Sequence, residues 1–303
     1  MSGAEADVGR RTGARARVSQ AVLAEGVRRL HAAGVPAARR DAEWLLAGLC
    51  GIDRVRLYAD SLPVDAAVIQ RYGAALDRRI RGEPIQYLLG WEDFCGLRVR
   101  VTPAVLIPRP ETEGLAEWAG GELTGGAAVA DVGTGSGCLA VAIATRQPAA
   151  RVCAIDSSPA ALAVAAENVR LLGVAGRVRL VAGDLLGAFA RGPVFDIIVA
   201  NPPYIPSAII ATLPVEVRAW EPHQALDGGQ DGMDVHRRLI PQAFSALRPG
   251  GTLMMEMGDG QASDLAANMA AAGFTGIVVR TDLNGTERYA GGHRPRGSVG
   301  GAG

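Results

Sequence analysis

A stiff loop follows one of the apolar runs of the sequence. The stretch IIVANPPYIP covers residues 197–206 and places Asn201, Pro202, Pro203 and Tyr204 directly after that run. Because both prolines lack a backbone N–H and have a fixed φ, neither can continue a central strand. The loop offers two hydrogen-bond acceptors, the Asn201 carboxamide oxygen and the Pro202 carbonyl, beside an aromatic ring. The sequence therefore predicts a stiff loop at this place.

A glycine-rich loop is the second candidate site. In the stretch VADVGTGSGCLAVAIA, the residues Gly133, Gly135 and Gly137 lie between an apolar run and a helical pattern. Glycines at this place let the backbone approach a ligand closely, and the following helix N-terminus offers free N–H groups. The dinucleotide fingerprint spaces its glycines as Gly-x-Gly-x-x-Gly. The alternate spacing found here therefore disfavours a pyrophosphate cofactor.

Acidic residues end successive apolar runs around this loop. Asp131 precedes the glycines, Asp156 ends VCAID, and Asp184 follows in VAGDLL. An acid that ends the second strand of such a unit accepts hydrogen bonds from ribose hydroxyls. Each Asp alone could be a helix N-cap, but the three together favour a cationic nucleoside without phosphates.

The elements that position these residues alternate between strand and helix after Gly126. The patterns predict strands at 128–131, 152–155, 178–182, 197–200, 252–257 and 277–280, with helices between them, beginning for example at Cys138 and Ala160. Alternation of this kind gives a mostly parallel sheet with helices on both faces, and continuous apolar strands fit a sheet buried on both sides. We expect a doubly wound α/β domain.

The first part of the chain has a different character. Apolar residues recur at three- and four-residue steps from Val18 to about Arg81, which predicts a small all-helical domain. Two short strand-like stretches, one on either side of Cys95-Gly96, predict a β-hairpin. The expected organisation is a flexible tail at 1–17, a helical domain at 18–84, a hairpin linker at 85–110, an α/β domain at 111–290 and a flexible tail at 291–303.

Composition limits the class of protein. The 303 residues are 49% hydrophobic and 20% charged with a formal net charge of zero, so a sizeable core is expected and a dedicated nucleic-acid binder is not. The four cysteines form no CxxC pair and have no histidine at metal-ligand spacing, which predicts free thiols and no metal site. With neither a secretory signal nor an apolar run of membrane-spanning length, the expectation is a cytoplasmic enzyme.

Residues 128–290 resemble Rossmann-like methyltransferases that use S-adenosyl-L-methionine, with a seven-stranded sheet. NPPY after the fourth strand is similar to the signature of those that methylate a nitrogen conjugated to a planar π-system. Such a nitrogen is a poor nucleophile because its lone pair is delocalised. Fixed acceptors at both of its N–H groups orient it and return electron density to it, and a ring such as that of Tyr204 packs against the plane.

The short motif leaves the substrate open among DNA adenine or cytosine, guanine of ribosomal RNA, and protein glutamine. Longer motifs favour the last. The chain resembles the release factor glutamine methyltransferase family from about Val18 to Ala290, through GEPIQYLLGWEDF, LIPRPETE, GTGSG, NPPYIP and EPHQALDGGQDGMDVHRRLI. The alternative is an N-methyltransferase that acts on an exocyclic amino group of a nucleobase in rRNA or DNA. A cofactor-binding scaffold without turnover and a dehydrogenase are further alternatives.

The resemblance implies specific roles. It implies methylation of the glutamine in the Gly-Gly-Gln motif of peptide-chain release factors, with the helical domain docking this protein substrate. The implied cofactor-binding residues are Gly133, Thr134, Gly135, Ser136, Gly137, Asp156, Asp184, Leu185 and Asn201. The implied substrate-binding residues are Asn201, Pro202, Pro203 and Tyr204, with Asn201, Pro202 and Tyr204 in catalysis. Leu185 stands where family members often have an aromatic beside the adenine. A monomer without stable nucleic-acid binding is expected.

Overall fold

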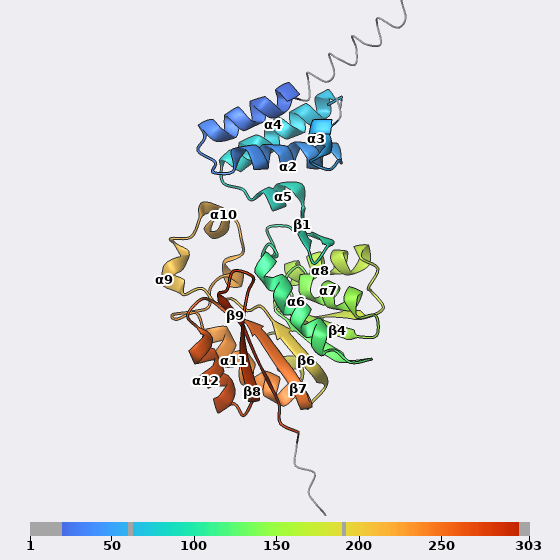
Figure 1. Cartoon of the computed structure of the whole chain (residues 1–303), viewed down its shortest axis with the longest axis vertical. Helices are drawn as coiled ribbons and strands as arrows, with labels where there is room; N and C mark the ends of the chain where they lie inside the picture. Colours follow the sequence, from blue (N-terminus) through green and yellow to red (C-terminus); the bar gives the residue numbers. More distant parts are fainter. Residues whose placement is uncertain (1–19, 60–62, 190–191, 297–303) are drawn as a thin grey trace, which may run out of the picture. The chain divides into compact units, whose positions relative to one another are not determined.

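The computed structural model describes residues 20–59, 63–189 and 192–296, which form two compact units (Figure 1). The helical unit contains the described residues up to Gly90 together with Val215–Trp220. The α/β unit contains Trp91–Pro214 and the described residues from Glu221 onward. The predicted tail at 1–17 lies outside the described residues.

The helical unit is built from short amphipathic helices. They are a helix over residues 20–32, α2 (Ala38–Cys50), α3 (Arg56–Ala59), α4 (Ala66–Ile80), α5 (Ile85–Leu89) and α10 (Val215–Arg218). Leu30, Leu45 and Leu76 are buried in its core. The carboxylate of Asp65 accepts a hydrogen bond from the Val68 amide at 2.7 Å and so caps α4. The predicted all-helical fold of this part is confirmed.

A buried arginine holds these helices together. Arg79 on α4 is 4% exposed, and its Nε donates to Asp41 Oδ2 of α2 at 2.8 Å. Its Nη2 donates to Glu216 of α10. Burying a guanidinium is costly unless it is paired and hydrogen-bonded. The two carboxylates provide this pairing. Because one of them belongs to Glu216, the pairing also explains why Val215–Trp220, although distant in sequence, is part of the helical unit.

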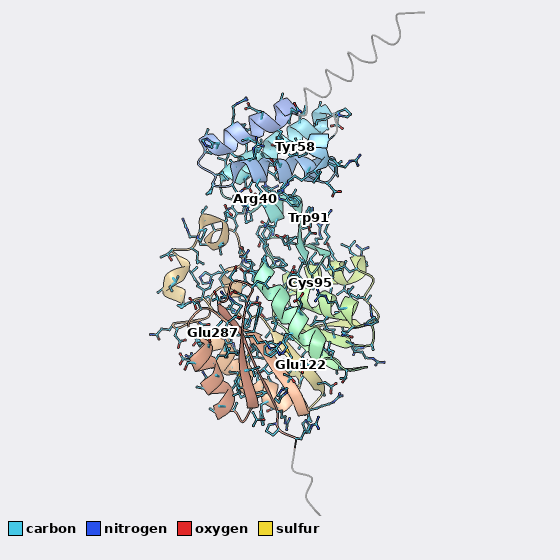
Figure 2. The ribbon with its side chains drawn as sticks, in the orientation of Figure 1. Arg40, Tyr58, Trp91, Cys95, Glu122 and Glu287 are labelled. Atoms are coloured by element: carbon cyan, nitrogen blue, oxygen red, sulfur yellow. The ribbon has the colours of Figure 1, made fainter. Side chains whose placement is uncertain are left out.

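The predicted hairpin is confirmed, but the segment around it is divided. Strands β1 (Trp91–Phe94) and β2 (Leu97–Arg100) pair antiparallel within the α/β unit. Cys95 (Figure 2) and Gly96 turn between them with φ of 52° and 75°, a geometry that matches the twist of a hairpin. Helix α5 belongs instead to the helical unit, because Leu89 fills the space that a side chain at Gly48 would need.

The main sheet has seven strands in the order β5-β4-β3-β6-β7-β9-β8. The pairs from β5 to β7 are parallel, and β9 is antiparallel to both β7 and β8. The bounds are β3 (Ala128–Val132), β4 (Arg151–Asp156), β5 (Val178–Ala182), β6 (Phe195–Ala200), β7 (Leu247–Glu256), β8 (Thr275–Thr281) and β9 (Glu287–His293). The predicted Rossmann-like, mostly parallel sheet is confirmed.

Helices cover both faces of this sheet (Figure 1). Val129 and Val199 join one apolar cluster, with α6 (Pro110–Glu122), α7 (Cys138–Arg146) and α8 (Pro159–Leu171). Ala130 and Ala200 join the other, with α11 (Asp234–Ala246) and α12 (Ala262–Ala271). Burial on both faces explains why the strands are continuous apolar runs. The remaining short helices are η1 (Gly187–Phe189), α9 (Ser207–Ile210) and η2 (His223–Ala225).

Strand β9 was not among the predicted strands, and it continues past the predicted domain end at residue 290. The expected tail from 291 is wrong at its start, since β9 runs to His293. Gly291 and Gly292 read as tail residues in the sequence. In the fold, a Cβ on Gly291 would lie 2.5 Å from the Trp118 ring and 2.9 Å from the Leu253 carbonyl. The glycine is required because α6 and β7 both pack closely against β9 at this position.

One buried asparagine joins the hairpin to the glycine loop, and its loss should destabilise the fold. Asn168 is fully buried; its Nδ2 donates to the carbonyls of Arg100 and Ser136, and its Oδ1 accepts from the Arg100 amide at 2.7 Å. Asn168→Leu leaves one buried and two partly buried backbone groups without this partner, and an unsatisfied buried group costs about 1–3 kcal/mol. We expect the free energy of unfolding in urea to fall by about 3 kcal/mol or more. Asn284→Leu, at an exposed position, should change it by less than about 0.5 kcal/mol.

Candidate active site

The candidate residues meet where the strand order reverses. Strand β3 lies between β4 and β6, and the chain turns back to β6 after β5. Val132 pairs with both Ile155 and Ala200, so the loops that begin at Gly133 and Asn201 leave the sheet side by side. Open α/β sheets bind ligands at this kind of crossover. A cavity of about 440 Å³ lies here.

The glycine loop has the backbone that its sequence demands. Gly133, Gly135 and Gly137 have φ of 74°, 55° and 80°, values that L side chains rarely adopt. The Gly133 and Thr134 amides donate to the Ile155 carbonyl, each at 2.9 Å. Gly133, Thr134, Gly135 and Ser136 line the cavity. Gly137 is not among the lining residues; a Cβ there would lie 3.2 Å from Ala165, so this glycine lets α8 approach the loop.

Asp131 is buried beneath the loop. Its Oδ2 accepts from Thr134 Oγ1 and from the Ala140 amide, which caps the start of α7. Oδ1 has no hydrogen-bond partner among the described residues. Burial raises the pKa of Asp131 to about 7, against the effect of both donors.

This shift predicts a pH-dependent stability. A carboxyl whose pKa is raised on folding binds more protons in the folded state than in the unfolded state. Its contribution to the free energy of unfolding is therefore fully present below about pH 4 and is lost as the pH rises to about 7. We expect the unfolding free energy of the wild type, relative to Asp131→Asn, to fall over this range in urea titrations. The asparagine can place its oxygen at the paired position and its NH2 at the unpaired one. Parallel pH profiles of the two proteins would contradict this assignment.

Asp156 and Asp184 border the same cavity. Asp156 Oδ2 accepts from the Gly135 amide at 2.8 Å, and its Oδ1 accepts from the Ser158 amide at 2.9 Å. A carboxylate oxygen has two lone pairs, so each can accept a further hydrogen bond. Asp184 is exposed and is ion-paired with Arg238, which also lines the cavity. Asp156 therefore shapes the loop and keeps capacity for a ligand.

Leu185 lines the cavity in an unusual backbone conformation. Its φ is 49°, in the left-handed region that costs a non-glycine residue about 1–3 kcal/mol. The next amide, of Leu186, is held by Gln242 Oε1 at 3.0 Å, and Leu186 is buried. This anchoring holds the strained residue in place, so that an aliphatic wall, rather than an aromatic one, borders the cavity.

The NPPY loop contributes unequally to the cavity. Asn201, Pro202 and Pro203 line it, whereas Tyr204 is not among the lining residues. Asn201 Nδ2 donates to Thr112 Oγ1 at 3.0 Å. The hydroxyl of Tyr204 donates to Glu256 Oε1 at 3.2 Å, which turns this polar end toward the sheet.

Sequence reasoning missed Thr112 and Glu256. Thr112 Oγ1 donates to Glu256 Oε2 at 2.8 Å, and Glu256 is fully buried at the end of β7. Burial raises the pKa of Glu256 to about 7. An acid that ends an apolar strand was the signal used for Asp156, and the same signal was present at Glu256.

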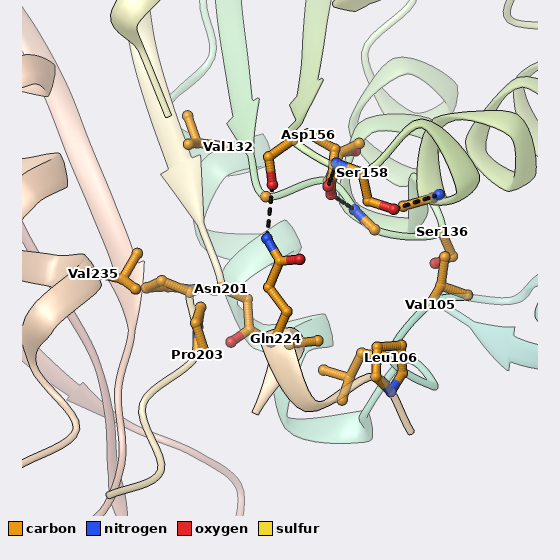
Figure 3. Close-up of a pocket in the computed structure, with 18 of the residues that line it drawn as sticks. Val105, Leu106, Val132, Ser136, Asp156, Ser158, Asn201, Pro203, Gln224 and Val235 are labelled. Atoms are coloured by element: carbon orange, nitrogen blue, oxygen red, sulfur yellow. Dashed lines mark hydrogen bonds between the residues drawn. The ribbon is translucent and has the colours of Figure 1, made fainter. Parts of the chain in front are cut away.

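Two further contacts bridge distant segments around the cavity. The carboxylate of Glu221 accepts from the Ile107 amide and from the Arg109 guanidinium. Gln224 Nε2 donates to Ser157 Oγ at 2.9 Å, and Figure 3 shows Gln224 pointing across the cavity toward the segment of Asp156. The walls thus come from stretches far apart in the chain.

The described residues contain no group of histidine, cysteine and acidic side chains arranged to hold a metal ion. Among them there is also no helix of the length and apolarity needed to cross a membrane.

Comparison with known families adds to this geometry. Residues 21–90 match the model of the PrmC N-terminal domain, and residues 122–212 match that of the methyltransferase small domain. The release factor glutamine methyltransferase of Geobacter sulfurreducens is 44% identical over 86% of this chain and 90% of its own. The chain belongs to the release factor glutamine methyltransferase family. The member from Moorella thermoacetica is 47% identical over 88% of this chain and 95% of its own.

Solved structures agree with the fold. A methyltransferase from Pyrococcus furiosus superposes with a TM-score of 0.51 at 20% identity, over 66% of this chain and 90% of its own. Membership of the release factor glutamine methyltransferase family makes the protein a methyltransferase. The dehydrogenase alternative is thereby set aside.

Proposed function

We propose that the protein transfers a methyl group from S-adenosyl-L-methionine to the side-chain amide nitrogen of the glutamine in the Gly-Gly-Gln motif of peptide-chain release factors. One observation carries the proposal: the glycine loop and the NPPY loop leave neighbouring strands at the crossover of the sheet. A donor on the first loop and an acceptor nitrogen on the second then lie within reach of each other.

The residues present fit this donor. Both arginines that line the cavity are ion-paired, Arg109 with Glu221 and Arg238 with Asp184, so neither is free for a phosphate. The remaining lone pairs of Asp156 can accept from ribose hydroxyls, and Leu185 gives an apolar surface to a base. Residues 133–136 bring backbone to the cavity, and Gly133 and Gly135 do so without a side chain in the way. The bound donor supplies an electrophilic methyl carbon on a sulfonium.

Asn201 and Pro202 orient the glutamine amide in this proposal. The Asn201 Oδ1 and the Pro202 carbonyl each accept one N–H of the substrate NH2, while the Tyr204 ring packs against its plane. Pro202 and Pro203 fix the carbonyl before binding, so little ordering is needed during the reaction. With the donor bound, this loop would have to hold the nitrogen about 3–3.5 Å from the methyl carbon.

The reaction balances without a side-chain base. The nitrogen lone pair forms the N–C bond as the C–S bond breaks, and the bonding pair stays on sulfur to give S-adenosylhomocysteine. The N-methylated, protonated amide is a strong acid and gives one proton to water. His236, fully buried with Nε2 against the Glu256 carbonyl, has no role in proton transfer.

The proposed substrate also indicates where in the cell the reaction takes place. A release factor belongs to the translation machinery, so the reaction takes place in the cytoplasm. The helical unit, whose residues 21–90 match the model of the PrmC N-terminal domain, docks this protein substrate. We propose that the enzyme acts as a monomer and forms no stable complex with nucleic acid.

Incubation with methyl-labelled donor tests the proposal. A release factor should become labelled, and mass spectrometry should place one methyl group on the Gln of its Gly-Gly-Gln peptide. The same factor with this Gln replaced by Ala is the matched control and should stay unlabelled. Label on ribosomal RNA or DNA with none on the release factor would overturn the proposal in favour of a nucleobase N-methyltransferase.

A further inference from the structure

We infer that Thr112 and Glu256 are positioning residues, which set the direction of a buried hydrogen-bond chain so that the carboxamide oxygen of Asn201 faces the acceptor amide. The inference rests on the proposed function, because it concerns the orientation of the substrate nitrogen. The chain runs from Asn201 Nδ2 to Thr112 Oγ1 at 3.0 Å and from Thr112 Oγ1 to Glu256 Oε2 at 2.8 Å.

The position of Glu256 follows from the register of the sheet. Ala200 of β6 pairs with Met255 of β7, so the residues that follow them, Asn201 and Glu256, emerge side by side. Glu256 is fully buried, and its carbonyl is held by His236 Nε2 at 2.9 Å. Thr112, which is 2% exposed, comes from the first turn of α6 and inserts between them.

The carboxylate fixes the direction of every bond in the chain. Burial raises the pKa of Glu256 to about 7, so above that pH its carboxyl is ionised. An ionised Glu only accepts, so the hydroxyls of Thr112 and Tyr204 must then both donate to it, one to each oxygen. A threonine hydroxyl has one proton. Thr112 has therefore used its proton and can only accept from Asn201.

This direction decides which end of the Asn201 carboxamide meets the substrate. The NH2 must face Thr112, so the oxygen must point away from it, and Asn201 is one of the residues that line the cavity. In the reverse orientation the NH2 would face an amide that itself donates two N–H groups. Two donors facing each other cannot orient a nucleophile, so the chain from Glu256 selects the productive orientation.

The test compares Thr112→Val with Thr112→Ser in methylation of a release factor. Valine keeps the shape of threonine but removes the acceptor for Asn201, and we expect kcat to fall about 10- to 100-fold with a smaller change in the KM for the donor, as for loss of a hydrogen bond of about 1.4–3 kcal/mol. Serine keeps the hydroxyl and should retain kcat within about threefold. Glu256→Leu removes the acceptor of the Thr112 proton, so the direction of the chain is no longer fixed, and it should lower kcat in the same way.

A matched variant controls for loss of a buried threonine hydroxyl. Thr252 is 7% exposed, lies on β7 like Glu256, and pairs through Oγ1 with His293 Nδ1 in the middle of that strand. Thr252→Val should keep kcat within about twofold, since it lies away from the cavity. Thermal melting shows whether each variant is folded, and calorimetric titration shows whether it still binds the donor.

The outcomes separate this inference from the proposed function. If the wild type does not methylate the release factor, the proposed function fails. If the wild type is active and folded Thr112→Val matches it in kcat, the positioning role is wrong. It is equally wrong if Thr112→Ser loses as much activity as Thr112→Val, because then shape rather than the hydroxyl is what matters.

Discussion

Asn201→Ala should nearly abolish methyl transfer while donor binding remains measurable. The substitution removes one of the two acceptors that orient the planar nitrogen, and loss of one preorganised hydrogen-bonding group at a reacting centre lowers kcat by about 10²–10³-fold. The donor keeps its contacts with the glycine loop and with Asp156. Single-turnover transfer to a release factor measures the rate, and calorimetry with S-adenosylhomocysteine measures binding.

A matched control for this prediction is Asn284→Ala. Asn284 is an exposed asparagine in the turn between β8 and β9, and its loss should leave kcat unchanged within about twofold. Asn201→Ala with more than about a tenth of the wild-type rate would contradict the acceptor role. This result would also remove the central support for the proposed mechanism.

Asp156→Ala should weaken donor binding by about 100-fold or more. A hydrogen bond to a charged group contributes about 1.5–3 kcal/mol, and each 1.4 kcal/mol is a factor of ten in affinity. The substitution also frees the Gly135 amide, which Asp156 holds at 2.8 Å. The loss of affinity thus combines a direct contact with a loosened loop.

Calorimetric titration with S-adenosylhomocysteine measures this loss. Asp264→Ala, in the exposed first turn of α12, removes a carboxylate of the same kind away from the cavity and should bind as the wild type does. An affinity of Asp156→Ala within about threefold of the wild type would show that this carboxylate does not contact the donor.

The sequence predicted those parts of the site that follow from strand ends. Parallel strands place their carboxyl ends at one edge of the sheet, so the order of strands and loops along the chain was enough to group Gly133, Asp156 and Asn201. The positive φ at the loop glycines and the rigid NPPY corner also follow from local residue types. The sequence was a sufficient guide for residues whose backbone conformation follows from their own residue type.

Features that depend on tertiary packing were not predictable in this way. Thr112 reads as an ordinary first-turn residue. The register of β6 with β7 brings Asn201 beside Glu256, and the packing of α6 places Thr112 between them. Gly291 reads as part of a loose tail, because nothing local reveals the Trp118 ring against it. The pairing of Arg79 with Glu216 joins residues far apart in sequence.

The cavity walls come from chain segments that are remote from one another, including Leu106, Gly135 and Gln224. Any molecule that fills this space cross-links those segments non-covalently, and only in the native state. Occupancy at 100 times the dissociation constant should add about 2.7 kcal/mol to the unfolding free energy. Spent cofactor should protect the enzyme from heat and proteolysis as fresh donor does, so a melting curve should report how fully the site is occupied and not which of the two molecules occupies it.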